Sequence, residues 1–124
     1  MGDSRVPSTA VPEPRNDLEA TIAALWRDAR RRMLGRVGVL EEACAALRAG
    51  ALDREAAEHA RREAHKLAGA LGTFGMPDGT DHARLLEHRL EAGAAAEDEP
   101  ALAAAAGALR RIVEAGPGAP GGEP

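Results

Sequence analysis

Apolar side chains recur at spacings of three and four residues along four segments of this chain. That spacing places them on one face of an α-helix, the face that packs against a core. Turn residues separate the segments around Gly50–Asp53, at Met76–Gly79 and after Gly93. Because these connections are short, consecutive helices must run antiparallel. The sequence therefore predicts an all-α fold, an antiparallel four-helix bundle with up-down-up-down topology.

The first predicted helix is the longest of the four. Asn16 or Asp17 can cap its start, and Gly50 ends it. We interpret Trp26 as a core anchor and Cys44 as a small core residue, because both fall on the apolar stripe. The stripe contains Leu18, Ile22, Leu25, Trp26, Ala29, Met33, Val37, Leu40, Cys44 and Leu47.

Three shorter helices are predicted after it. Asp53 can cap the second helix, and Thr80 or Asp81 the third. Pro100 suits the first position of the fourth, because a residue there needs no amide hydrogen. The apolar stripes are Ala56, Ala60, Ala64, Leu67, Leu71 and Phe74 in the second helix; Ala83, Leu86 and Leu90 in the third; and Leu102, Ala105, Leu109, Ile112 and Val113 in the fourth.

Composition divides the chain into three parts. Residues 1–15 are predicted to form a disordered N-terminal arm, residues 16–115 the bundle, and residues 116–124 a flexible Gly/Pro-rich tail or linker. The net charge of −4 gives no basis for nucleic-acid binding. No apolar run is long enough to cross a membrane. The single cysteine excludes an internal disulfide, which fits a cytoplasmic protein.

His65 is predicted to face away from the core. A rotation of about 100° per residue places it roughly 160° from Leu67, near the centre of the buried stripe. Gly69 and Gly72 lie on the same outer side, and each costs about 1 kcal/mol relative to alanine within a helix. Outward glycines make no core contact that offsets this cost, but they let another backbone approach closely. We interpret this face as a docking surface cleared by Ala68, Gly69 and Gly72.

The residues around His65 also suggest a chemistry. A neutral imidazole is a nucleophile near neutral pH. Arg61 and Arg62 lie one turn before His65, and guanidinium groups favour a phosphate attached to a neighbouring side chain. The pattern therefore indicates a histidine that accepts a phosphoryl group from a large partner.

The motif His65–Gly69, followed by Gly72 and Phe74-Gly75, closely resembles the signature of histidine-containing phosphotransfer (HPt) domains. The resemblance covers roughly residues 17–115. It implies a four-helix bundle whose one exposed histidine exchanges phosphate, through Nε2, with aspartates of receiver domains. This chain would then be a phosphocarrier of a bacterial-type two-component phosphorelay and not an enzyme with its own ATP site.

The resemblance also implies partners and supporting residues. The expected partners are a response-regulator receiver domain and/or a hybrid histidine kinase, and we expect the chain itself to be a monomer. No cofactor is expected, because the divalent ion that the reaction needs belongs to the receiver. Members of the family often have lysine three residues after the histidine, where this chain has Ala68. Lys66, Arg61 and Arg62 are therefore the expected sources of positive charge.

A secondary docking surface is predicted on the first helix. Counting away from the loop at Gly50–Asp53 in both directions puts His65 level with residues 35–38. Gly35, Gly38 and Val39 lie off the apolar stripe at this level, so the outward glycines of two helices would share one height of the bundle. The alternative is that Gly35 and Gly38 mark a kink.

Other functions have weaker support in the sequence. The histidine pairs His59/His65 and His82/His88 are six residues apart, whereas metal-binding histidines on one helix are three or four apart, so no metal site is expected. A non-catalytic helical adaptor, binding a signalling partner through the same face, is the main alternative. A kinase-linked domain separated from its ATP-binding half is a second one.

Overall fold

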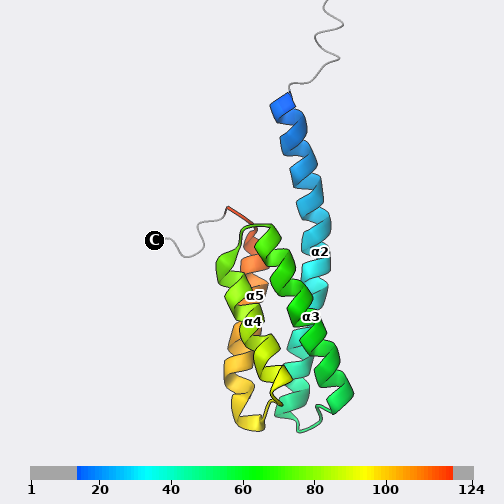
Figure 1. The fold of residues 1–124 in the computed structure, drawn as a ribbon, viewed down its shortest axis with the longest axis vertical. Coiled ribbons are helices and arrows are strands. Elements are labelled where there is room, and N and C mark those ends of the chain that lie inside the picture. Colours follow the sequence, from blue (N-terminus) through cyan, green and yellow to red (C-terminus); the bar gives the residue numbers. More distant parts are fainter. Residues whose placement is uncertain (1–13, 119–124) are drawn as a thin grey trace, which may run out of the picture.

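The computed structural model of the chain describes residues 14–118, which form four α-helices and one short 3₁₀ helix (Figure 1). The elements are α2 (Pro14–Arg48), α3 (Arg54–Thr73), α4 (Pro77–Glu91), η1 (Ala96–Asp98) and α5 (Glu99–Ala115). Helices α2 and α4 each pack mainly against α3 and α5, so the four helices surround one core. The predicted all-α antiparallel bundle is confirmed.

The core is built from the apolar faces of all four helices. Its largest fully buried side chains are Met33, Val37, Leu40, Leu67, Leu71, Leu86, Leu102, Leu109 and Val113. Each of these contributes about 1.5–3 kcal/mol by leaving water. Cys44 is buried as predicted, and desolvation raises the pKa of its thiol to about 11. The thiol is therefore protonated near neutral pH and acts as a small apolar group.

The helix boundaries follow the sequence signals in part. Asp53 caps α3 as predicted, and its side chain accepts a hydrogen bond from the backbone amide of Ala56 at 2.8 Å. Gly50, where the first helix was expected to end, has a φ of 71°, which favours glycine, and α2 ends two residues earlier at Arg48. Helix α5 starts at Glu99, so Pro100 is its second residue and not its first.

The predicted start of the third helix is wrong. Helix α4 begins at Pro77, with Met76 before it, and neither Thr80 nor Asp81 is its cap. Proline has a backbone φ already suited to the first helical turn, so the helix starts there without a side-chain cap. Gly79 is then a buried helical residue, and a Cβ added to it would meet Leu71 at 3.1 Å. The glycine serves close helix packing and not a turn.

The amino-terminal part of α2 projects beyond the other helices (Figure 1). Leu18, Ile22 and Leu25, which were expected in the core, are 60%, 51% and 59% exposed. Helix α2 has 35 residues, whereas α3, α4 and α5 have 20, 15 and 17, so the shorter helices end before they reach this part of the stripe. Ala56, at the start of α3, is also exposed although it was placed on the stripe.

Trp26 marks the end of the packed bundle. It is half-buried, and its ring meets Phe74 edge-on with centroids 5.1 Å apart. A Cβ added to Gly116 would lie 3.4 Å from Nε1 of Trp26. Gly116, the first residue of the expected tail, is therefore half-buried beside Trp26. Residues 119–124, like residues 1–13 of the expected N-terminal arm, lie outside the described part of the chain.

The difference between the two parts of α2 predicts different responses to the same substitution. Leu40→Ala should lower the free energy of unfolding by about 3 kcal/mol, because it opens a cavity in the core. Leu25→Ala should lower it by less than about 0.5 kcal/mol, because that side chain is already in water. Urea unfolding of both variants in dilute solution, followed by circular dichroism, measures the difference. Equal losses would contradict the exposed position of Leu25.

Candidate functional site

His65 faces solvent from the middle of α3, as the sequence predicts. Its side chain is 66% exposed. The neighbouring Glu63 accepts a hydrogen bond from Arg36 of α2 at 2.9 Å, which fixes the two helices against each other at this level. Burial opposes the ionisation of Glu63, but the hydrogen bond and charge of Arg36 outweigh it and lower its pKa. Because Glu63 lies two residues before His65, this contact places His65 close to the level of residues 35–38 on α2.

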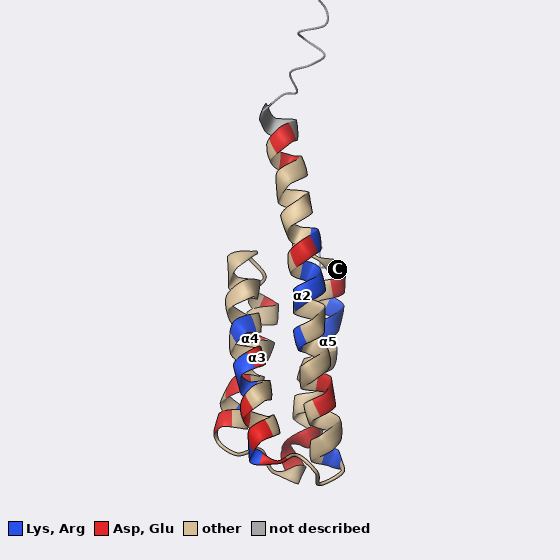
Figure 2. Cartoon of the chain, turned by 90° about the vertical axis from the view of Figure 1, so that its right-hand side faces the viewer, with Lys and Arg blue, Asp and Glu red and all other residues tan. Residues whose placement is uncertain are grey.

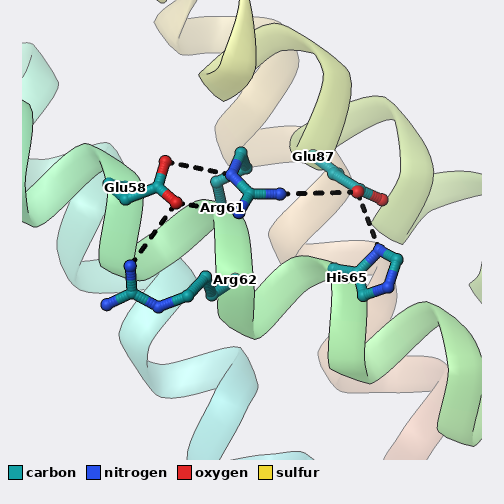
Figure 3. Close-up of polar contacts among 5 residues, drawn as sticks. All are labelled: Glu58, Arg61, Arg62, His65 and Glu87. Atoms are coloured by element: carbon teal, nitrogen blue, oxygen red, sulfur yellow. Dashed lines mark hydrogen bonds and ion pairs between the residues drawn. The ribbon is translucent and has the colours of Figure 1, made fainter.

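A glutamate from the neighbouring helix holds the imidazole ring. Oε2 of Glu87, on α4, lies 2.8 Å from Nδ1 of His65 (Figure 3). Glu87 is only 8% exposed as a residue, although its side chain is polar. We did not predict this residue from the sequence. A signal was present, because Glu87 stands four residues after Ala83 and three before Leu90, on the apolar stripe itself.

This contact determines which ring nitrogen is available for chemistry. An ionised carboxylate can only accept hydrogen bonds, so we infer that the hydrogen shared with Glu87 belongs to Nδ1. In a neutral imidazole with hydrogen on Nδ1, the other nitrogen, Nε2, carries the unshared electron pair. The contact of Nδ1 therefore orients the ring, and Nε2 is the nitrogen that remains available to a partner.

The two arginines predicted beside His65 are held by carboxylates. Arg61 donates to Glu58 at 2.8 and 3.0 Å and also lies 3.8 Å from Oε2 of Glu87 (Figure 3). Arg62 donates to Glu58, four residues before it on the same helix, at 3.4 Å. The hydrogen bond from Arg61 is the main cause that lowers the pKa of Glu58. Arg61 therefore links Glu87, which holds His65, to Glu58, which lies about one turn before Arg61 on α3.

Lys66 lies on the other side of the histidine. Its Nζ is 3.6 Å from Oε2 of Glu63, and its side chain is 55% exposed. Arg62 is similarly accessible at 51%, whereas Arg61 is only 25% exposed. The exposed pair of Arg62 with Glu58 contributes about 0–1 kcal/mol, so the Arg62 side chain can exchange partners at little cost. The contact of Lys66 with the mostly buried Glu63 is long, at 3.6 Å.

The space beside His65 is open, but one predicted member of the clearing is misplaced. Gly69 and Gly72 are exposed, and within residues 14–118 no other helix or distant side chain comes within 4 Å of a Cβ added to either. Ala68 was predicted on the outer side, but it is only 3% exposed. It lies four residues after the buried Ala64, so the buried face of α3 is wider than the expected stripe.

The predicted secondary surface on α2 is partly open. Gly35 is exposed and Gly38 half-buried, and a Cβ added to either would have no contact within 4 Å among the described residues. Val39 is half-buried and packs against the core, so it offers only part of its side chain to a partner. Helix α2 continues through both glycines, from Pro14 to Arg48.

The remaining histidines lie at the surface or its boundary. His59 and His88 are exposed, and His82 is half-buried. In the part of the chain that the structure describes, no three His, Cys, Asp or Glu side chains are grouped to hold a metal ion. None of the helices within this part combines the length and the hydropathy that a membrane crossing requires.

A family model for the Hpt domain matches residues 24–115, which include His65, Glu87 and all of α3, α4 and α5. The chain belongs to the Hpt domain family. Hpt domains are phosphocarriers that interact with receiver domains and kinases in phosphorelays, and they lack an ATP site of their own. No curated protein and no solved structure matches the chain.

The contact between His65 and Glu87 predicts a defined tautomer. In the native protein we expect the ring hydrogen on Nδ1, and Glu87→Ala should abolish this preference because the acceptor is gone. Long-range proton–nitrogen NMR spectra of the histidine rings distinguish the two forms. Glu91→Ala, an exposed carboxylate on the same helix, is the matched control. A native ring with its hydrogen on Nε2 would contradict the inference.

Proposed function

We propose that His65 is the phosphoryl acceptor and donor of this Hpt domain and that it exchanges the group with aspartates of receiver domains. The observation that carries the proposal is the anchored ring: Nδ1 is held by Glu87 at 2.8 Å while 66% of the side chain is exposed. Gly69 and Gly72 keep the adjacent surface open. An oriented nucleophile in an accessible clearing is what transfer between two proteins requires.

The transfer step follows from this geometry. The unshared pair on Nε2 forms a bond to phosphorus, and the bond from phosphorus to the aspartyl oxygen breaks, which returns its electron pair to the carboxylate. The hydrogen on Nδ1 stays on the ring, which becomes positively charged. Glu87 faces that charge at hydrogen-bonding distance and stabilises it, as a carboxylate does beside a catalytic histidine. The same steps in reverse donate the group.

Positive charge for the phosphoryl group is proposed to come from Lys66 and Arg62, with a smaller share from Arg61. Lys66 and Arg62 are more than half exposed and each is held by an exposed or weak ion pair. Arg61 is bound to both Glu58 and Glu87, so it has less freedom to turn toward a ligand. A phosphoryl group offers more negative charge than one carboxylate and can compete for these side chains.

The partners are proposed to be a receiver domain and/or a hybrid histidine kinase, and the divalent ion is assigned to the receiver. The cytoplasmic location and the bacterial type of the relay stay predictions from the sequence.

Replacing the acceptor tests the assignment of the site. His65→Gln should abolish acid-labile labelling when the protein is mixed with phosphorylated receivers, because the amide is not a nucleophile toward phosphorus. His88→Gln, which changes an exposed histidine on α4, should be labelled like the native protein. Label retained on His65→Gln would assign the acceptor to another residue. A native protein that binds the receivers without labelling would instead support the adaptor.

Filling the clearing tests the docking surface. Gly69→Leu should slow transfer by about 100-fold, because a side chain there displaces the incoming receiver from His65. The variant should stay folded, since leucine favours helix more than glycine does. Gly107→Leu on α5 is the matched control, because α5 packs on α2 and α4 and not on the face with His65. Native transfer rates in Gly69→Leu would show that docking does not use this surface.

A further inference from the structure

The cations that α3 places near the candidate acceptor are all paired with carboxylates. Arg61 and Arg62 are held by Glu58 at 2.8 and 3.4 Å, and Lys66 lies 3.6 Å from a carboxylate oxygen of Glu63. A phosphoryl group that approaches α3 therefore has to draw each of these side chains away from an existing partner.

The clearing beside His65 has no charge of its own on α3. Gly69 and Gly72 lie there, and residues 67–73 carry no charged side chain (Figure 2). A phosphoryl group brings about −1.5 to −2 charges near neutral pH. A cation from a neighbouring helix would therefore stabilise the group in this clearing.

Contacts between α3 and α4 place Arg84 beside the clearing. Gly79 lies against Leu71, and Glu87 holds His65. Arg84 stands between these two positions of α4, three residues before Glu87, or about 4.5 Å along the helix. Because the two helices are antiparallel, this step leads along α3 from His65 toward Leu71, which is the direction of the clearing.

The position of Arg84 around α4 also suits the clearing. Leu90 is buried in the core, and Glu87, on the side of α4 next to α3, reaches His65. At about 100° per residue, Arg84 lies about 60° beyond Glu87 in the direction away from Leu90. It is exposed, as this rotation requires. Arg84 thus stands at the outer edge of the contact between α3 and α4.

The guanidinium of Arg84 is both long enough and free enough to meet a ligand there. Glu87 already spans the distance from α4 to the ring of His65, and arginine has a longer side chain than glutamate. Within residues 14–118 no ion pair holds Arg84, in contrast to the cations of α3. The planar fork of donors on a guanidinium matches two oxygens of a phosphoryl group.

We propose that Arg84 binds the phosphoryl group of this site by donating hydrogen bonds to its oxygens while phosphorus is bonded to Nε2 of His65. The inference rests on the proposed function of His65 as the acceptor. Two residues of α4 then have separate tasks: the carboxylate of Glu87 holds Nδ1, and the guanidinium of Arg84 faces the transferred group.

Labelling by phosphoramidate tests the proposal without a receiver. In this reaction Nε2 of His65 forms a bond to phosphorus, the phosphorus–nitrogen bond of the donor breaks, and its electron pair leaves on ammonia. Arg84→Ala should lower the rate of phosphohistidine formation about tenfold, because a charge-assisted hydrogen bond to the phosphoryl group is lost. Arg84→Lys should recover part of the rate, since lysine keeps the charge but not the planar fork. Phosphorus NMR measures the rates.

Arg111→Ala is the matched control. It removes an exposed arginine from α5, which packs on α2 and α4, and it should be labelled at the native rate. Equal rates in Arg84→Ala and Arg111→Ala would overturn the inference and leave the proposed function intact. A loss in Arg84→Ala that appears only with phosphorylated receivers would show that Arg84 contacts the receiver, which also overturns it. A native protein that takes no label from either donor would overturn the proposed function and this inference together.

Spectra of the arginine side chains give a direct measurement of the contact. The Nε–H resonance of Arg84 should shift when His65 is phosphorylated, and that of Arg111 should not. In Arg84→Ala the tautomer of His65 should stay native, which separates phosphate binding from loss of the Glu87 contact. An Arg84 resonance that stays in place while His65 carries phosphate would overturn the proposal.

Discussion

Close packing of α3 against α4 is the constraint on which the site depends. Small residues line this contact: Ala60, Ala64 and Ala68 on α3 and Ala83 on α4 are all buried. Gly79 completes it, since a Cβ there would meet Leu71 at 3.1 Å. Short side chains let two helix backbones approach each other. The carboxylate of Glu87 can then reach the ring of His65 from the neighbouring helix at 2.8 Å.

Burying the carboxylate of Glu87 between α3 and α4 costs free energy of folding. It is almost fully buried, and its Oε1 has no hydrogen-bond partner among the described residues, while Oε2 serves both His65 and Arg61. A buried oxygen without a partner costs about 1–3 kcal/mol, and an apolar residue of similar size would avoid that cost. The core gains nothing from this carboxylate, so its contribution is to the orientation and charge of the histidine.

Features that are set within a single helix were predicted from the sequence, whereas the contact between two helices was missed. The outward direction of His65 and the cap at Asp53 are local to α3, and both were predicted correctly. The role of Glu87 depends on the distance between α3 and α4, which no spacing along one helix contains. Leu18 was wrongly placed in the core because periodicity identifies the face of a helix but not where its neighbours end. Ala68 was misplaced because the buried face is wider than a stripe of every third or fourth residue.

The length of α2 gives the molecule two separate surfaces. From Ala29 onward the helix is packed into the bundle, and Arg36 fixes it to Glu63 beside the candidate site. Before Trp26 the same face continues with the same spacing but without neighbours. Changes in that segment alter apolar area and charge far from His65, and changes around His65 leave the segment untouched. One continuous helix thus joins the packed part of the domain to an apolar face that no other described residue covers.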